Sequence, residues 1–234
     1  MKRMKMGVVR TAVIGFLFVT AAAAHAVNSP ELDKVLRQMD AVSEKFQSAQ
    51  ADFTWDQYEK VVDSHDVQTG TIYFQRKGGQ TEMAAIVREM NGKPAPKDVT
   101  YTGGQLYLYQ PNIDQLTIFS AGVKREQYES FLTLGFGSSG RDLEKNWDIT
   151  YLGMEAVNGV QTAKLDLVGK QASVRANFKH ITIWVDPVKD VSLKQQFFAP
   201  SDDMRTATYD HVQSPAKIPA SVFKVKKAGN VVRH

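Results

Sequence analysis

The chain has 234 residues, with 29 Lys and Arg against 25 Asp and Glu, and it contains no Cys. The lack of Cys excludes disulfides, thiolate metal sites and lipidation of this chain itself. Four of the basic residues lie within the first ten positions, so the remainder is formally neutral. Without a basic field or a basic stripe, nucleic acid is not an expected partner.

The N-terminus predicts export. Several basic residues precede an apolar run over 11–24, which ends in an A-x-A sequence. The run is shorter than the ~20 residues that a bilayer span needs, and this favours a secretory signal peptide over a membrane anchor. We expect a signal peptide over 1–26, cleavage after Ala26, periplasmic localisation and a single mature domain over 27–234.

The first element predicted for the mature chain is an amphipathic helix of about 16 residues. Pro30 stands in its first turn, Asn28 or Ser29 can cap it, and Glu31 follows Asn28 at the spacing of a capping box. Its apolar residues recur at helical spacing and share one face: Leu32, Val35, Leu36, Met39, Val42 and Phe46.

From Ala49 onward the apolar period changes from 3.6 to 2, which is typical of β-strands. Strands this numerous, with short links, predict a mainly β (α+β) fold in which an antiparallel sheet of about eleven strands curls into a barrel. The segment from Lys93 to Lys97 is interpreted as an exposed loop. The predicted strands lie near 49–61, 67–77, 81–89, 98–102, 105–110, 114–119, 147–154, 161–168, 176–185, 191–199, 204–212 and 222–226.

The β pattern is interrupted once, where short helices are expected over 126–134 and 141–145. The connecting residues match a dinucleotide-binding pattern at Gly135, Gly137 and Gly140. That chemistry needs a strand-to-helix turn inside a βαβ unit, and no such unit surrounds these glycines. We therefore interpret the segment as a loop and expect no cofactor.

Catalytic or metal-binding motifs are not evident. No two histidines have the i, i+4 spacing of a zinc protease, and the neighbouring serines Ser138 and Ser139 lack the G-x-S-x-G pattern of a hydrolase. Asp63, His65 and Asp66 could meet a metal, but a polar hairpin turn fits them better. We expect neither an enzyme nor a metal site.

The strands are rich in aromatic and large aliphatic residues. Such residues form an ordinary core, or they line a ligand cavity when a barrel is wider than its own side chains fill. Composition leaves both interpretations open. The candidate cavity and lid residues are Leu32, Leu36, Met39, Phe53, Trp55, Ile72, Phe74, Leu106, Leu108, Ile118, Phe136 and Trp184.

Several segments, read in order, resemble the outer-membrane lipoprotein carriers, the LolA-like family in its broad sense. No single segment is diagnostic, but their order and spacing cover nearly the whole mature chain. The matching segments are Phe53, the strand 70–76, the segment 103–111, the strand 114–119, Leu132 to Gly137 with Asp142-Leu143, the strand 183–186, and the late strands with Tyr209 and Phe223.

The resemblance implies a half-open antiparallel barrel, apolar inside and covered by a helical lid. It also implies a carrier that takes lipoprotein acyl chains from an inner-membrane ABC transporter to an outer-membrane receptor, working as a monomer. An arginine at the end of the family's second strand reaches inside and bonds to the lid. That position falls on Arg76.

Three departures from the family's pattern bear on the cargo more than on the fold. Lys77 replaces a typical proline, a longer insert runs through 90–98, and the Gly-Phe-Gly block over 135–137 belongs to the wider family. A carrier of another lipid, or a periplasmic sensor on the same half-barrel, is the alternative within the binding class. A periplasmic esterase is the less favoured alternative, which a serine or carboxylate with a histidine partner in the cavity would indicate.

Overall fold

The computed structural model describes residues 29–78, 80–120 and 134–234. All of its strands belong to one sheet, in the order β12-β6-β5-β4-β3-β2-β1-β11-β10-β9-β8-β7. The strands are β1 Ser48–Glu59, β2 Ser64–Lys77, β3 Gln80–Met90, β4 Lys93–Thr102, β5 Gln105–Gln110, β6 Gln115–Ser120, β7 Trp147–Val157, β8 Val160–Gly169, β9 His180–Asp186, β10 Val191–Phe198, β11 Met204–Gln213 and β12 Asn230–Arg233.

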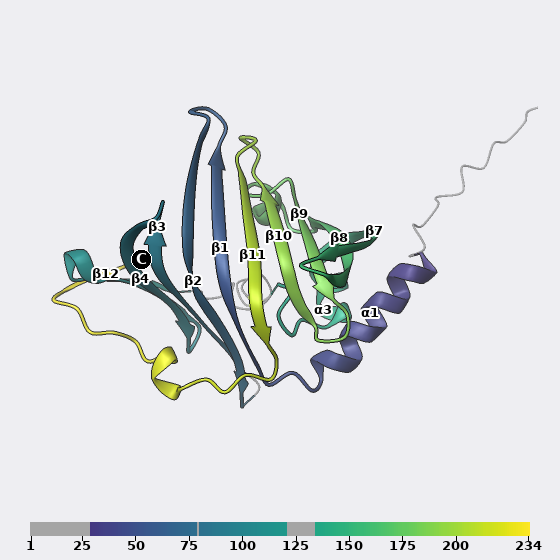
Figure 1. Ribbon diagram of the computed structural model, residues 1–234, viewed down its shortest axis with the longest axis horizontal. Helices are drawn as coiled ribbons and strands as arrows, with labels where there is room; N and C mark the ends of the chain where they lie inside the picture. The colour runs from purple at the N-terminus through teal and green to yellow at the C-terminus, as the bar shows by residue number, and fades with distance from the viewer. Residues whose placement is uncertain (1–28, 79, 121–133) are drawn as a thin grey trace, which may run out of the picture.

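The sheet is open, because its two edge strands β7 and β12 do not pair with each other (Figure 1). Every ladder is antiparallel except the last, in which β12 runs parallel to β6. The α-helices of the described residues are α1 Pro30–Ser43, α3 Gly140–Asn146 and α4 Ala172–Arg175, and two 3₁₀ turns are η1 Pro111–Ile113 and η3 Ala220–Phe223. The expected half-open, mainly β fold is confirmed, with twelve strands instead of about eleven.

Helix α1 begins as the sequence indicates. The Ser29 hydroxyl accepts a hydrogen bond from the backbone N–H of Leu32 at 3.2 Å, and Pro30 occupies the first turn. Its apolar face packs on the sheet at the end formed by β7, β8 and β9, and the helix ends at Ser43, three residues before Phe46 (Figure 1).

Helix α3 lies against α1 through a glycine. Ser139 caps α3 by accepting from the N–H of Asp142 at 3.0 Å, which confirms the helix expected over 141–145. A Cβ at Gly140 would lie 2.4 Å from the carbonyl oxygen of Leu36, so only glycine allows this approach of the two backbones. The other expected helix falls on 126–134, of which all but the last residue lie outside the described residues.

The segment from Lys93 to Lys97 is a strand, and its interpretation as an exposed loop is wrong. Asn91 and Gly92, at φ 52° and 71°, form the tight turn of a hairpin between β3 and β4. The prolines of β4 are accommodated because the ladder to β3 has a bulge between Val87 and Glu89.

Two other strand expectations need correction. The last predicted strand, 222–226, is mostly a 3₁₀ turn and loop in which Phe223 alone is buried, and the final strand is β12 instead. The strand predicted over 176–185 begins only at His180, because α4 and a short connection come before it. In both places only one or two apolar residues alternate, which is too few to predict a strand or its first residue.

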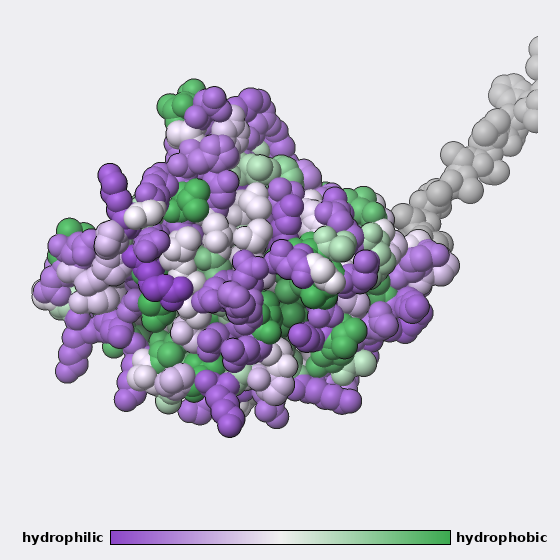
Figure 2. Space-filling view, viewed as in Figure 1, coloured by the Kyte–Doolittle hydropathy of each residue, from purple (hydrophilic) through white to green (hydrophobic). Residues whose placement is uncertain are grey.

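The hairpin joining β1 and β2 projects from the body and ends in apolar residues. Val61 is 90% exposed and Val62 63%, and Figure 2 shows a hydrophobic spot at this tip, in addition to hydrophobic patches on the body (Figure 2). In the part of the chain that the structure describes, none of the helices has both the length and the apolar character of a membrane span.

Replacing Gly140 with Ala should force α1 and α3 apart. We expect the free energy of unfolding to fall by about 1–3 kcal/mol, the range for overpacking a close contact. Urea unfolding followed by circular dichroism measures this, with Gln38→Ala on the exposed side of α1 as the control. Equal stability of the two variants would contradict the close α1–α3 contact.

Candidate functional site

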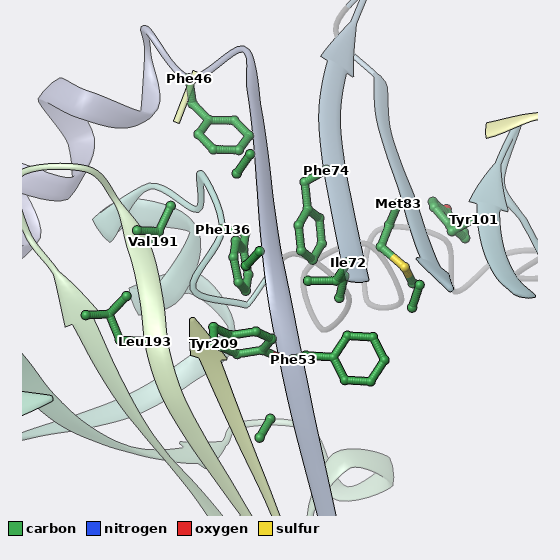
Figure 3. Close-up of a cluster of buried hydrophobic side chains, with 14 of the residues drawn as sticks. Phe46, Phe53, Ile72, Phe74, Met83, Tyr101, Phe136, Val191, Leu193 and Tyr209 are labelled. Carbon is green, nitrogen blue, oxygen red and sulfur yellow. The ribbon is translucent and has the colours of Figure 1, made fainter. Parts of the chain in front are cut away.

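The candidate site is the concave face of the sheet, where alternate residues of the strands point toward the lid. We use the term lid for α1, the loop over 134–139 and α3. Buried side chains on this face form a central cluster around Phe53, Ile72, Phe74 and Phe136, and a helix-side cluster where α1 packs on β8 and β9. Figure 3 shows the central cluster, with Phe74 and Tyr209 next to the loop residue Phe136 and Met83 farther to one side, near Tyr101 (Figure 3).

Aromatic stacking joins the lid loop to the sheet. The Phe136 ring stacks on Phe74 with centroids 4.3 Å apart, and it meets Tyr209 edge-on at 5.0 Å. Phe53 and Trp55 stack on each other at 4.1 Å. Such contacts add to the hydrophobic stabilisation of the loop in its closed position.

Polar groups under the loop fix its backbone. The Gln195 side-chain amide donates to the carbonyl of Leu134 at 2.6 Å, and its oxygen accepts from the Tyr209 hydroxyl at 3.1 Å. The backbone N–H of Ser192 donates to the carbonyl of Gly135 at 2.5 Å. Burial raises the pKa of Tyr209, so its hydroxyl keeps its proton and donates at any ordinary pH.

The glycines of the loop serve packing. Gly135 and Gly137 have φ of 74° and 70°, and a Cβ on Gly137 would lie 2.4 Å from the ring of Phe46. A Cβ on Gly135 would lie 2.5 Å from the side chain of Ser192. The glycine spacing therefore meets the needs of this loop without a phosphate ligand.

Arg76, at the end of β2, connects the sheet to both parts of the lid. Its guanidinium donates to the carbonyl of Ser43 at 2.7 Å and to the carbonyl of Gly137 at 2.8 Å. The Ser43 hydroxyl donates to the same Gly137 carbonyl at 2.9 Å, and the guanidinium lies 5.7 Å from the centre of the Phe46 ring. Arg76 itself remains exposed, so the bonds form at the rim of the concave face and not deep inside it.

A buried carboxylate, Asp190, lies in the same joint. Its backbone carbonyl accepts from the N–H of Gly137 at 3.0 Å, and its φ is 53°. Neither carboxylate oxygen has a hydrogen-bond partner among the described residues. Burial raises the pKa of Asp190 to about 8; the charge of Arg76 works against this rise and that of Asp40 adds to it.

A shallow pocket of about 320 Å³ opens beside this joint, where α1 passes into β1. Its walls combine apolar side chains with two lysines: Val42, Lys45, Phe46, Gln47, Val188, Lys189, Ser214 and Pro215. None of these residues except Phe46 belongs to the central cluster.

Most of the sequence-predicted site residues come together on the concave face. Phe53, Ile72, Phe74 and Phe136 form the centre of the cluster, Trp55 and Leu106 pack on it partly exposed, and Leu108 follows Leu106 on the same face. The three predicted lid residues are buried in the helix-side cluster: Leu32, Leu36 and Met39.

Two predicted residues are not brought to this face. Ile118 pairs with Tyr107, which alternates with Leu106 and Leu108, so Ile118 is on the opposite face of the sheet. Trp184 alternates with the inward residues of β9 and is packed between the ammonium groups of Lys164 and Lys194, at 4.9 and 4.6 Å. On β6 the alternation was misleading, because the apolar pair Leu116 and Ile118 lies on the outward face. On β9 the inward face was visible in Ile181, Ile183 and Val185, and Trp184 does not belong to it.

Asp190, Ser192 and Gln195 belong to the site, but the sequence pattern did not indicate them. A turn signal at Asp186-Pro187 was visible, but nothing in the pattern indicated that the turn would be buried under the lid. Gln195 stands where an apolar residue is expected on an inward-facing strand position, and this break in the alternation is the one signal that could have identified it.

Histidine–aspartate pairs occur outside the concave face. His65 contacts Asp56 at 2.8 Å, His180 contacts Asp166 at 2.6 Å and His211 contacts Asp52 at 3.1 Å. Each aspartate alternates along its strand with inward apolar residues, so these pairs face away from the lid. Within the described ranges, no cluster of three or more potential metal ligands is present.

Comparison with known proteins identifies the fold. No family model and no curated protein sequence matches the chain. Among solved structures, MucB is similar with a TM-score of 0.54 at 12% identity, over 87% of this chain and 66% of MucB. An uncharacterised conserved protein from Thermus thermophilus is similar with a TM-score of 0.53 at 13% identity, over 87% of this chain and 99% of that one.

A LolA superfamily protein from Nitrosomonas europaea also matches, with a TM-score of 0.40 at 13% identity, over 82% of this chain and 97% of that one. At these identities the likeness concerns the fold alone. The half-open, mainly β fold that the sequence resemblance implied is confirmed by the similarity to MucB and to the Thermus thermophilus protein.

The buried Asp190 predicts a pH-dependent stability. The pKa of Asp190 is raised in the folded state. Its contribution to the free energy of unfolding is therefore most favourable below pH 4 and is lost as the pH rises toward 8. Asp190→Asn keeps the shape and tolerates the positive φ. The variant should equal the wild type near pH 4 and be about 1–3 kcal/mol more stable at pH 8, as measured by urea unfolding at both pH values.

The exposed Asp148→Asn serves as the control and should show no such dependence. A stability difference between Asp190→Asn and the wild type that is the same at both pH values would contradict the assignment of a neutral, buried Asp190.

Proposed function

We propose that the chain is a periplasmic carrier that holds the acyl chains of lipoproteins on its concave face and moves them toward the outer membrane. The observation that carries this proposal is an open sheet with an apolar concave face, closed by a lid that Arg76 holds through two carbonyl oxygens. The signal-like segment over 1–26 supports the periplasmic location, and 27–234 would form the carrier domain.

Such a carrier needs no covalent chemistry. Its loading partner would be an inner-membrane ABC transporter and its acceptor an outer-membrane receptor. The inward residues of the described strands are mostly apolar, and the His–Asp pairs lie on the other face, which supports binding over catalysis. A monomer suffices for this function, because both lid and sheet come from one chain.

The lid contacts must compete with ligand binding, because acyl chains alone would bind too tightly to be released. Burial of one acyl chain of about sixteen carbons contributes roughly 12 kcal/mol, and three chains would approach ~35 kcal/mol, beyond the ~18–21 kcal/mol at which non-covalent affinity saturates. The lid contacts that a ligand displaces must therefore offset part of this gain. The stacking of Phe136 on Phe74 and the two Arg76 bonds are such contacts.

Binding can be tested on the concave face with a matched pair of variants. Leu108 and Ile118 are both partly buried on neighbouring strands, but only Leu108 shares the face of the central cluster. Leu108→Gln should weaken binding of a pyrene-labelled fatty-acyl probe by about ten- to a hundredfold, the worth of one buried leucine side chain. Ile118→Gln should leave affinity within about twofold, as judged by fluorescence titration.

Purified wild-type protein that takes up no acyl probe, and that shows no co-purified acyl species in native mass spectrometry, would refute the carrier proposal. An equal loss in Leu108→Gln and Ile118→Gln would place binding elsewhere than on the concave face.

The gating role of Arg76 predicts slow release. Arg76→Leu removes the two bonds that favour the closed lid, each worth about 1.5–3 kcal/mol as bonds to a charged group before solvent screening at the exposed rim reduces them. The closed empty state loses its advantage, so affinity for the probe should rise by about one to two decades and its dissociation should slow correspondingly. Stopped-flow transfer of the probe to acceptor vesicles measures the rate.

The neighbouring Lys77→Leu provides a control of equal charge change on an exposed residue. If transfer from Arg76→Leu is as fast as from Lys77→Leu, or faster, the gating role of Arg76 is contradicted.

A further inference from the structure

Two cations lie on the concave face, next to the central cluster. Lys97 of β4 pairs with Val87 and alternates with Val99 and Tyr101, which face the cluster. Arg205 of β11 pairs with Gln57 and alternates with Ala207 and Tyr209, which also belong to the cluster. The register therefore places both cations on the concave face, one layer of residues beyond its apolar centre.

The curvature of the sheet turns these two cations toward each other. Strands β4 and β11 are separated by β3, β2 and β1 in the sheet order (Figure 1). Nevertheless, the charge of Arg205, in addition to burial, lowers the pKa of the Lys97 ammonium group. The register places both side chains on the one curved face, and the Coulomb effect of Arg205 on Lys97 agrees with their charges lying near each other across it.

Neither cation has an acidic partner. Among the described residues, no carboxylate lies within ion-pair distance of Lys97 or of Arg205. Other exposed lysines do find partners: Lys60 and Lys179 both bind Asp202. Two like charges that face each other without a counter-charge are unfavourable, and an anion between them would remove the penalty.

The Arg205 guanidinium is oriented through its Nε atom, which leaves Nη1 and Nη2 available as donors. Its Nε donates to the Gln57 side-chain oxygen at 3.1 Å. Surrounding protein lowers the pKa of the guanidinium although its side chain is still reached by water, as expected for a group on the wall of an open concavity. Arginine in this setting presents a fork of donors suited to an anion with several oxygens.

We propose that Lys97 and Arg205 bind the phosphate of an acyl lipid whose chains lie on the apolar central cluster. The proposal rests on the acyl-carrier function of the concave face, and it selects the alternative cargo, a lipid other than a lipoprotein that has an anionic phosphate head group. The tetrahedral arrangement of phosphate oxygens can accept donors from two opposite walls at once. The two oxygens of a carboxylate lie in one plane and are usually satisfied by a single arginine fork.

The test compares lipids that differ only in the head group. Phosphatidylglycerol with one pyrene-labelled acyl chain and the diacylglycerol with the same chains are titrated into the wild type and into Lys97→Gln/Arg205→Gln. We expect the wild type to prefer phosphatidylglycerol, and the double variant to bind it ten- to a hundredfold more weakly. Diacylglycerol affinity should change less than twofold, and the preference should shrink in 0.5 M NaCl.

The control, Lys34→Gln/Arg37→Gln, makes the same charge change on the exposed side of α1 and should keep the preference. Equal binding of both lipids by the wild type would overturn the phosphate site and leave the carrier function standing, whereas binding of neither lipid would refute both. A different result is that the double variant loses affinity for a pyrene-labelled fatty acid and keeps its affinity for phosphatidylglycerol. That result would show that the two cations bind a carboxylate and not a phosphate.

Discussion

An open sheet has one face that segments outside the sheet must keep from water. Here that task falls to α1, the loop over 134–139 and α3, which pack on the sheet through apolar side chains and meet at one polar joint at its rim. Ser43 ends α1, Gly137 lies in the loop and Arg76 ends β2, and one guanidinium bonds to the carbonyls of the first two. The lid is therefore held by apolar packing on the sheet, and the bonds of Arg76 link its parts to one another and to β2.

The same apolar side chains act as core in the closed state and as ligand contacts in the proposed open state. Phe74 cannot stack on Phe136 and on an acyl chain at the same time. Stability of the empty protein and affinity for lipid are thus opposed, which suits a molecule that has to release what it binds. The cost of burying the Asp190 side chain without a hydrogen-bond partner is incurred at this same joint.

The sequence predicts the secondary structure elements better than it predicts which face of each strand turns inward. Helical periodicity with a capped start located α1, and the change to alternation located nearly every strand, because burial of one face imposes that pattern. On β6 the more apolar face, with Leu116 and Ile118, turns outward, so alternation placed Ile118 on the wrong side of the sheet. Trp184 was also assigned inward, although it alternates with the apolar Ile183 and Val185 of β9. Prolines masked the β4 strand, although Asn91-Gly92 is a strong hairpin signal.

Residues that depend on long-range packing gave no local signal. Lys97 and Arg205 are 108 positions apart in the sequence numbering, and only the curvature of the sheet turns them toward each other. Likewise, Asp190 is an ordinary turn residue until the loop around Gly137 covers it. The fold was accessible from periodicity and resemblance, whereas the electrostatics of the site had to await the tertiary structure.

The two edges of the sheet have a consequence for how the protein behaves among copies of itself. An unpaired strand exposes backbone donors and acceptors that can recruit a strand of another chain. At one edge β12 covers β6 in parallel and is only four residues long; at the other, β7 is distorted where its ladder to β8 shifts between Tyr151 and Met154. Neither edge offers a long, regular template, so an incomplete barrel can stay open to cargo without inviting fibrous self-association.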